Sequence, residues 1–305
     1  MIDRRWFLKS SLLLGLGVAP DPGLSAAAPE PRLAKPIPSS GELLPVIGMG
    51  TWQTFNVGNS ARLRDQRCQV LAKFLEMGGG MVDSSPMYGS SEEVIGHCIE
   101  QLGFHESLFS ATKIWTPSKK MGITQVENSR EYWGVSTFDL FQIHNLVRWQ
   151  GHLETLRELK QNGRLRYIGI TTSHGRKHKE LEAFLESNPV DFVQLTYNIS
   201  DREVEKRLLP LARDKGIAVI ANRPFQKGPL IDWCKRHPLP DWAVELNCSN
   251  WAQFLLKFIV SHPDITCTIP ATTQVAHMIE NMGAQFGTLP EPELRRKMIS
   301  YFESL

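Results

Sequence analysis

The sequence lacks the features that mark several large classes of protein. Charge of one sign is not in excess, because 34 Lys and Arg residues stand against 32 Asp and Glu residues, for a formal net charge of +2. The basic residues are scattered, and no zinc-finger or RNP-type signature accompanies them, so we expect no nucleic-acid partner. Hydrophobic residues make up 42% of the 305-residue chain and charged residues 22%, which indicates a globular rather than a disordered protein.

Cysteine is scarce and lacks the spacing of a metal or disulfide framework. The five cysteines are Cys68, Cys98, Cys234, Cys248 and Cys267, with no Cys-x-x-Cys pair among them. We predict that they are mostly buried apolar thiols, and a single disulfide is left open. His174 and His178 lie four residues apart, but "HGRKH" supplies no carboxylate ligand, so no metal site is predicted.

Long hydrophobic runs and two common glycine motifs are also missing. The apolar run near the N-terminus, Leu12 to Ala19, is too short for a hydrocarbon core that needs about 20 residues, so no stable membrane span is expected. No Gly-x-Ser-x-Gly elbow is present, which disfavours hydrolase chemistry. No Gly-x-Gly-x-x-Gly run follows a predicted strand, which disfavours an open dinucleotide-binding sheet.

The N-terminus resembles an export signal. Arg4 and Arg5 precede Trp6-Phe7-Leu8-Lys9 and the short apolar run, and three alanines ending at Ala28 follow Ser25. This pattern resembles a bacterial twin-arginine signal peptide. The resemblance implies that the Tat export machinery recognises residues 1–28 and that the folded protein reaches the periplasm with its cofactor already loaded. The proline-rich residues 29–45 are expected to be a tether to a domain at 46–305.

Further along the chain, short apolar segments alternate with amphipathic ones, as in parallel strands joined by helices. Strands are expected over 46–50, 81–84, 108–113, 138–144, 167–171, 192–197, 218–221 and 266–270. Helices are expected over 62–77, 91–102, 152–161, 177–186, 202–214 and 253–260. Eight such units in about 260 residues favour an α/β fold of the closed (β/α)8 TIM-barrel type over an open sheet.

Polar residues follow three of the predicted strands at the barrel end where catalysis takes place. Asp83 and Tyr88 follow the second strand, Lys113 ends the third, and His144 ends the fourth. Reduction of a carbonyl needs a hydride on carbon and a proton on oxygen, and a phenol with a pKa of about 10 is a weak acid near neutrality. We expect Asp83 to keep Lys113 charged, Lys113 to lower the pKa of Tyr88, and a neutral His144 to orient the carbonyl.

This ordered quartet resembles the catalytic tetrad of the aldo-keto reductase superfamily. Other stretches similar to that family are "VIGMGTW" at 46–52, "YIGIT" at 167–171, "VQLTYN" at 193–198, and "TIPATT" with "MIENMGA" within 268–284. The resemblance implies an oxidoreductase that moves hydride between a nicotinamide cofactor and a small aldehyde or ketone. Tyr88 would be the general acid in reduction and the general base in oxidation.

The same resemblance implies an extended dinucleotide across the barrel mouth, bound without a glycine fingerprint. Thr171 and Gln194 match positions that contact the nicotinamide carboxamide. Asn222 stands where many members stack a tyrosine on the nicotinamide, which leaves Arg223 or Phe225 as substitutes. The family's substrate-pocket positions correspond to Trp52, Met87, Trp115 and Asn145.

At the adenosine end, Glu280 and Asn281 match family positions near the nucleoside. The last loop offers Thr272 and His277 where relatives hold the 2′-phosphate with Lys and Arg. Loss of one charge-assisted contact, worth roughly 1.5 to 3 kcal/mol, could reduce the preference for NADP over NAD about ten- to a hundredfold. NADP is therefore expected because most members of the family use it, and not because of these residues, with NAD as the alternative.

Two other functions stay open on the sequence. A nucleotide-sensing or partner-binding barrel with vestigial chemistry is favoured by the absence of a stacking aromatic residue at Asn222. A lyase on the same barrel would use Lys113 to form a Schiff base with a carbonyl substrate. We expect the protein to be a monomer.

Overall fold

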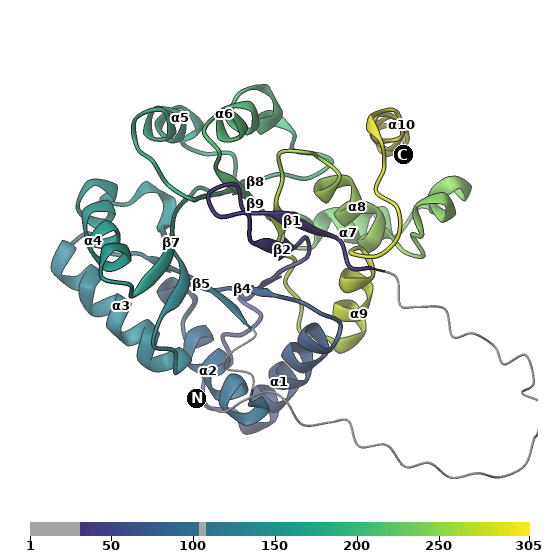
Figure 1. The fold of residues 1–305 in the computed structure, drawn as a ribbon. Coiled ribbons are helices and arrows are strands. Elements are labelled where there is room, and N and C mark those ends of the chain that lie inside the picture. Colours follow the sequence, from purple (N-terminus) through teal and green to yellow (C-terminus); the bar gives the residue numbers. More distant parts are fainter. Residues whose placement is uncertain (1–30, 104–107) are drawn as a thin grey trace, which may run out of the picture. The chain divides into compact units, whose positions relative to one another are not determined.

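The computed structural model describes residues 31–103 and 108–305, which form a parallel barrel surrounded by helices (Figure 1). Its eight strands are hydrogen-bonded in the order β10-β9-β8-β7-β6-β5-β4-β3, each parallel to its neighbour. They are β3 (Met49–Gly50), β4 (Met81–Asp83), β5 (Phe109–Ile114), β6 (Phe138–Ile143), β7 (Leu165–Thr171), β8 (Phe192–Thr196), β9 (Ala218–Asn222) and β10 (Cys267–Thr268). The predicted strands and the predicted TIM barrel are confirmed.

The barrel closes between its first and last strands. Ile47 forms a parallel bridge with Thr268, and the Gly50 amide donates a hydrogen bond to the Pro270 carbonyl. Glycine is needed at position 50, because a Cβ there would lie 2.8 Å from the carbonyl oxygen of Ile269. This closure places Gly50 beside Asp83 of β4 in the strand register, at the carboxyl end of the barrel.

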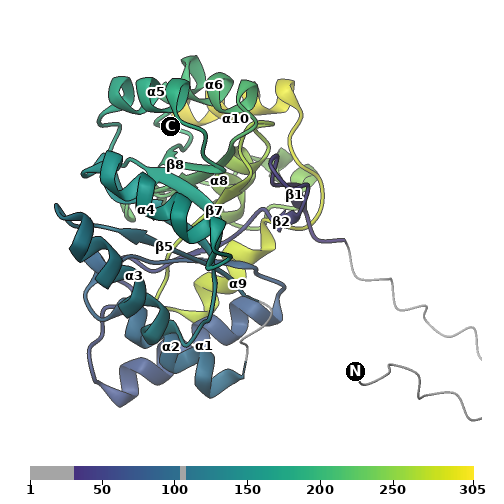
Figure 2. The same ribbon diagram turned by 60° about the vertical axis from the view of Figure 1, so that its left-hand side comes forward.

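Helices surround the strands in both ribbon views (Figures 1 and 2). They are α1 (Ala61–Glu76), α2 (Ser91–Leu102), α3 (Lys119–Trp133), α4 (Trp149–Gln161), α5 (His178–Ser187), α6 (Leu208–Asp214), α7 (Pro229–Cys234), α8 (Trp251–Val260), α9 (Val275–Gly283) and α10 (Pro292–Ser304). Short 3-10 helices are η1 (Pro86–Tyr88), η2 (His144–Leu146), η3 (Glu203–Lys206) and η4 (Asp241–Leu246). The helices α3, α7, α9 and α10 were not among the segments assigned from the sequence. In α3 the buried positions include glycine and serine, so its apolar periodicity is weak.

The expectation of a tether over residues 29–45 is wrong for the part that the structure describes. The strands β1 (Ala34–Pro36) and β2 (Leu43–Pro45) form an antiparallel pair. Ile37 and Leu44 on this hairpin are buried in one cluster with Met81 and Phe109, at the amino ends of β4 and β5. The hairpin therefore closes the bottom of the barrel, opposite the predicted catalytic end.

One disulfide links two outer helices. Cys68 on α1 bonds to Cys98 on α2, whereas Cys234, Cys248 and Cys267 are free and buried. Of the described helices, none has the length and apolar character needed to cross a membrane. The predicted signal peptide, residues 1–28, lies outside the described residues.

Candidate active site

A cavity of about 620 Å³ opens at the carboxyl ends of the strands. Asp83, Tyr88 and His144 line it, as does every residue predicted to bind the cofactor: Thr171, Gln194, Asn222, Arg223, Thr272, His277, Glu280 and Asn281. The predicted substrate residues Trp52, Met87 and Asn145 also line it, but Trp115 does not. Trp115 lies outside this lining, with its backbone hydrogen-bonded to the Gln125 side chain.

The backbone around the cavity is unusually strained. Positive φ angles occur at Gln53, Asn145, His174, Arg223 and Lys227, all of which line the cavity. Such conformations cost of order 1 to 3 kcal/mol for residues other than glycine and concentrate at functional sites. The loops that follow the strands are therefore shaped for ligand contact at a cost in folding stability.

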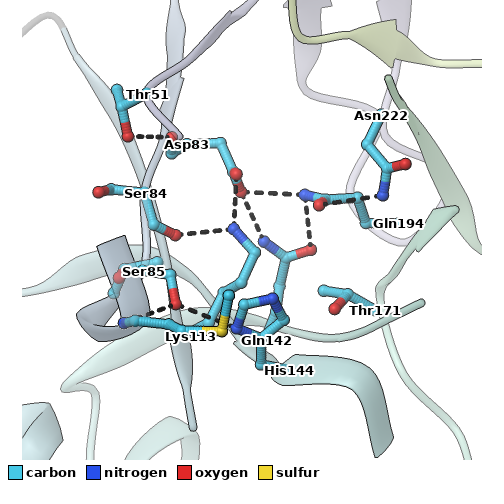
Figure 3. Close-up of polar contacts among 12 residues, drawn as sticks. Thr51, Asp83, Ser84, Ser85, Lys113, Gln142, His144, Thr171, Gln194 and Asn222 are labelled. Carbon is cyan, nitrogen blue, oxygen red and sulfur yellow. Dashed lines mark hydrogen bonds and ion pairs between the residues drawn. The ribbon is translucent and has the colours of Figure 1, made fainter. Parts of the chain in front are cut away.

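Lys113 and Asp83 form a fully buried ion pair at the base of the cavity (Figure 3). The Lys113 Nζ lies 2.5 Å from the Asp83 Oδ2 and donates a second hydrogen bond of 2.7 Å to the Ser84 carbonyl. Lys113 is 0% exposed and does not line the cavity. An amine held in this way cannot reach a carbonyl substrate, so the structure disfavours the Schiff-base lyase.

The other carboxylate oxygen of Asp83 is held by two amides. Gln142 Nε2 and Gln194 Nε2 donate to Asp83 Oδ1 at 2.9 and 3.0 Å, as Figure 3 shows. Gln142 was missed in the sequence, although it lies near the end of β6, two residues before the predicted catalytic residue His144. With both oxygens occupied, Asp83 acts as the fixed anchor of Lys113.

Tyr88 stands next to this pair on η1. The Lys113 Nζ lies 5.3 Å from the centre of the Tyr88 ring, and no hydrogen bond joins the two side chains among the contacts of the described residues. Burial, with a further contribution from the Asp83 charge, raises the pKa of Tyr88 well above its usual value of 10. The expectation that Lys113 lowers this pKa is therefore wrong for the protein without ligands, because Asp83 neutralises the ammonium at close range.

His144 is neutral, as predicted. Burial, and then repulsion from Lys113, lowers its pKa to about 3. The His144 Nδ1 lies 3.1 Å from the Ser85 Oγ, which also accepts a hydrogen bond from the Met87 amide. Ser85 was not singled out in the sequence, since a serine in a turn carries no distinctive signal. Among the residues that the structure describes, this contact leaves the Nε2 of His144 as the ring nitrogen without a hydrogen-bond partner.

The predicted nicotinamide contacts come from three neighbouring strands. Asn222 is locked in place, because its Nδ2 donates to the Thr172 carbonyl at 2.9 Å and its Oδ1 accepts from Thr196 at 2.8 Å. Thr171 accepts a hydrogen bond from the Asn145 amide. The Thr172 hydroxyl is buried and has no hydrogen-bond partner within residues 31–103 and 108–305, although the residue lines the cavity. Phe225, which also lines the cavity, is the aromatic side chain available in the loop after Asn222.

Several basic side chains line the cavity without an acidic partner. Arg176, Arg223, Lys227 and Lys235 line it, and the ion pairs formed within residues 31–103 and 108–305 include none of them. The Lys227 Nζ lies 4.2 Å from the centre of the Trp52 ring, a cation–π contact between two different loops. Unpaired cations and an unused buried hydroxyl fit the phosphates and the carboxamide of a nicotinamide dinucleotide.

The described residues form a TIM barrel with a buried Asp-Lys pair beside a tyrosine and a neutral histidine, the arrangement that the sequence predicts for an oxidoreductase. The model of the aldo/keto reductase family matches residues 46–297. The chain therefore belongs to the aldo/keto reductase family.

Individual relatives agree with this assignment. Methylglyoxal reductase YeaE of Escherichia coli is 26% identical over 272 residues, which cover 85% of this chain and 92% of the relative. The NADH-specific methylglyoxal reductase of the same organism is 27% identical over 234 residues, 65% of this chain and 68% of the relative. A solved aldo/keto reductase from Klebsiella pneumoniae, in complex with NADP and acetate, aligns with a TM-score of 0.72 at 24% identity and covers 86% of this chain and 93% of that chain.

Proposed function

We propose that this protein is an exported reductase that uses NADPH to convert a small aldehyde or ketone to an alcohol. The single observation that carries the proposal is the grouping of Asp83, Lys113, Tyr88 and His144 at one end of a cavity about 620 Å³ in volume. The names of the methylglyoxal reductases support a small reactive carbonyl as substrate.

The protein's own groups supply the proton and the orientation. A bound nicotinamide cofactor would supply the hydride. We assign the imidazole hydrogen of His144 to Nε2, with Nδ1 accepting from Ser85, so that Nε2–H can donate to the carbonyl oxygen and orient it. Tyr88 then donates its phenolic proton to that oxygen as negative charge develops there. The phenolate that remains faces the Lys113 ammonium, whose charge stabilises it.

The raised pKa of Tyr88 keeps its proton available but makes the phenol a weaker acid, so proton transfer depends on the negative charge that develops on the carbonyl oxygen and on the charge of Lys113. Burial keeps the phenol protonated across the neutral range, so every enzyme molecule carries the proton before substrate binds. In the oxidative direction Tyr88 must first lose that proton, which the same burial opposes. We therefore propose that the oxidative reaction needs a more alkaline pH than the reductive one.

We propose NADP as the cofactor, with NAD as the alternative. The unpaired cations Arg223, Lys227 and Lys235 on the cavity wall would bind phosphate groups, and Thr172 and Gln194 would contact the carboxamide. The NADP complex of the Klebsiella relative supports this choice, whereas the NADH-specific relative shows that the family also uses NADH. Fluorescence titration of the purified protein with NADPH and NADH decides between them, and tighter binding of NADH would overturn the choice of NADP.

Export rests on the resemblance of residues 1–28 to a twin-arginine signal. The Cys68–Cys98 disulfide supports it, because disulfides persist in oxidising compartments and are rare in the cytosol. The periplasm is not expected to supply free dinucleotide, so we propose that the enzyme retains its cofactor tightly. Cell fractionation with an Arg4→Lys, Arg5→Lys variant as control tests export, and accumulation of the wild-type protein in the cytoplasm would exclude it.

Nicotinamide absorbance of the exported protein tests retention of the cofactor. Oxidation of NADPH by the purified enzyme in the presence of methylglyoxal, with Tyr88→Phe as control, tests the reaction. A protein that binds neither dinucleotide, or that turns over equally well without the phenol, would favour a partner-binding barrel instead.

A further inference from the structure

A second buried carboxylate lies behind the catalytic lysine. Glu92, in the first turn of α2, is 3% exposed and does not line the cavity. Successive side chains of a strand point to opposite faces. Since Lys113 on β5 faces Asp83 inside the barrel, its neighbour Thr112 faces the helices, and there it meets Glu92.

Glu92 joins three elements through its two oxygens. Its Oε1 accepts hydrogen bonds from the Thr112 Oγ1 at 2.6 Å and from the Trp133 Nε1 at 3.3 Å. Its Oε2 accepts a hydrogen bond of 3.0 Å from the Ser129 Oγ. Strand β5 is thereby fastened to α2 and α3 at the position next to Lys113.

The same turn of α2 also supports the other side of the lysine. The Ser91 Oγ lies 3.1 Å from the Ser84 Oγ, and the Ser84 carbonyl accepts a hydrogen bond from the Lys113 ammonium. Ser91 and Glu92 are adjacent in the chain. One turn of helix therefore contacts both Thr112, which precedes Lys113 in sequence, and the side chain of Ser84, the residue whose carbonyl accepts the hydrogen bond from the ammonium.

The charges around Lys113 do not balance. Asp83 on β4 and Glu92 on α2 are two carboxylates around a single buried cation, and the other titratable groups that face it, Tyr88 on η1 and His144 on η2, are neutral. From α3, the side chains that contact Glu92 are the uncharged Ser129 and Trp133. The polar and covalent links between α1 and α2 include the Cys68–Cys98 disulfide and the Arg64–Glu93 pair, neither of which involves Glu92.

The direction of the pKa shifts agrees with this arrangement. Burial lowers the pKa of Lys113, and the charges of Asp83 and then of Glu92 oppose that shift. Burial raises the pKa of Glu92 to about 7, against the hydrogen bonds and the charge of Lys113. Glu92 is therefore ionised above about pH 7, and its charge then favours the protonated form of Lys113.

We propose that Glu92 is a positioning residue that holds Lys113 in place, and in its charged form, from the outer side of β5. Its catalytic consequence rests on the proposed function, because the Lys113 charge acts on the phenolate of Tyr88. Glu92 touches neither the cavity nor any group that reacts there. Its effect must therefore be seen in the titration of Lys113 and in kcat, and not in binding.

The test is Glu92→Gln, which keeps the shape of the side chain and removes its charge; the amide oxygen can still accept from Thr112 and Trp133, while the amide nitrogen can donate to the Ser129 hydroxyl. Glu93→Gln is the matched control, because Glu93 is exposed in the same turn and its only ion pair there is at 3.9 Å. In Glu92→Gln we expect the Lys113 amine to titrate about half a unit to one unit lower, and the alkaline limb of kcat to move with it. The KM for the carbonyl and the affinity for NADPH should not change.

NMR of the protein with isotope-labelled lysine side chains measures the titration of the Lys113 amine directly and does not depend on enzyme activity. The Lys113 signal is assigned by its absence from the spectrum of Lys113→Met. Identical Lys113 titrations in wild type, Glu92→Gln and Glu93→Gln would overturn the proposal, as would an equal loss of kcat at every pH. If Glu92→Gln does not fold, the wild-type protein still decides, since its Lys113 signals must shift as Glu92 titrates near pH 7. A wild-type protein that reduces no carbonyl refutes the proposed function, but leaves this titration as a test of Glu92 by itself.

Discussion

The Lys113 ammonium and the Asp83 carboxylate lie 2.5 Å apart, and both side chains are almost completely buried. Breaking such a pair from one side leaves an uncompensated charge, which costs roughly 3 to 5 kcal/mol. We expect Asp83→Asn to lower the free energy of unfolding by about this amount in urea titrations. The double variant Asp83→Asn, Lys113→Met should recover part of the loss, whereas Glu154→Gln, at an exposed ion pair, should not change stability measurably. An Asp83→Asn variant as stable as the wild type would mean that the ion pair contributes little to the free energy of unfolding.

Replacement of Tyr88 by phenylalanine tests the proton donor. We expect Tyr88→Phe to lower kcat about 10²- to 10⁴-fold, because the hydroxyl supplies the proton in the transition state. Affinity for NADPH should stay within about twofold of the wild-type value, measured by fluorescence titration. Equal kcat values for the two proteins would remove Tyr88 from the mechanism.

Acid should destabilise the protein through His144. Its pKa is about 3 in the folded chain and about 6.5 when unfolded, so the unfolded state binds more protons between these values and stability falls as the pH is lowered through this window. Between pH 6.5 and 4.5 the loss is about 2 kcal/mol, at roughly 1.4 kcal/mol per pH unit before discounting for partial solvation. We expect His144→Gln to lack this component when urea unfolding is repeated at each pH. Parallel pH curves for the two proteins would contradict the lowered pKa.

The disulfide should stabilise the first two helices of the barrel. It closes a loop with a sequence separation of 30 residues, which corresponds to about 3 to 4 kcal/mol in the chain-entropy model. We expect a reducing agent to lower the Tm of the wild-type protein. The Cys68→Ser, Cys98→Ser variant should melt at the lower temperature with or without reductant, since the remaining cysteines are free. A wild-type Tm that does not respond to reductant would show that the bond does not form.

We expect the Thr172 side chain to lower the stability of the ligand-free protein and to strengthen cofactor binding. Its hydroxyl is buried without a partner, which costs about 1 to 3 kcal/mol in the ligand-free protein. We expect Thr172→Val to raise the Tm and to weaken NADPH binding by about tenfold. Thr155→Val is a useful comparison, because the buried Thr155 hydroxyl already donates to the Gly151 carbonyl and lies outside the cavity. Unchanged affinity for NADPH in Thr172→Val would exclude Thr172 from the cofactor site.

The alternation of apolar and amphipathic segments, together with the residues that end each apolar run, was sufficient to predict the barrel and its catalytic end. Strand order and closure follow from local pattern and the right-handed crossover, so Asp83, Lys113 and His144 could be assigned to one mouth. The hydrophobic pattern of the sequence did not predict structure where the burial of a residue depends on partners that are distant in the chain. Ile37 and Leu44 look like isolated apolar residues among prolines, and only the folded barrel offers them the hydrophobic cluster that makes a hairpin of that segment.

The electrostatics of the site were decided by the tertiary structure. The order of residues in the chain identified an ammonium and a phenol as neighbours, but the pKa of Tyr88 depends on how deeply it is buried and on how closely Asp83 already neutralises Lys113. Gln142 and Ser85 contact the site from separate elements, and Glu92 contacts Thr112 on the outer side of β5. Sequence determined which chemical groups are present at the barrel mouth, whereas distance and desolvation, which exist only after folding, determined their charge states.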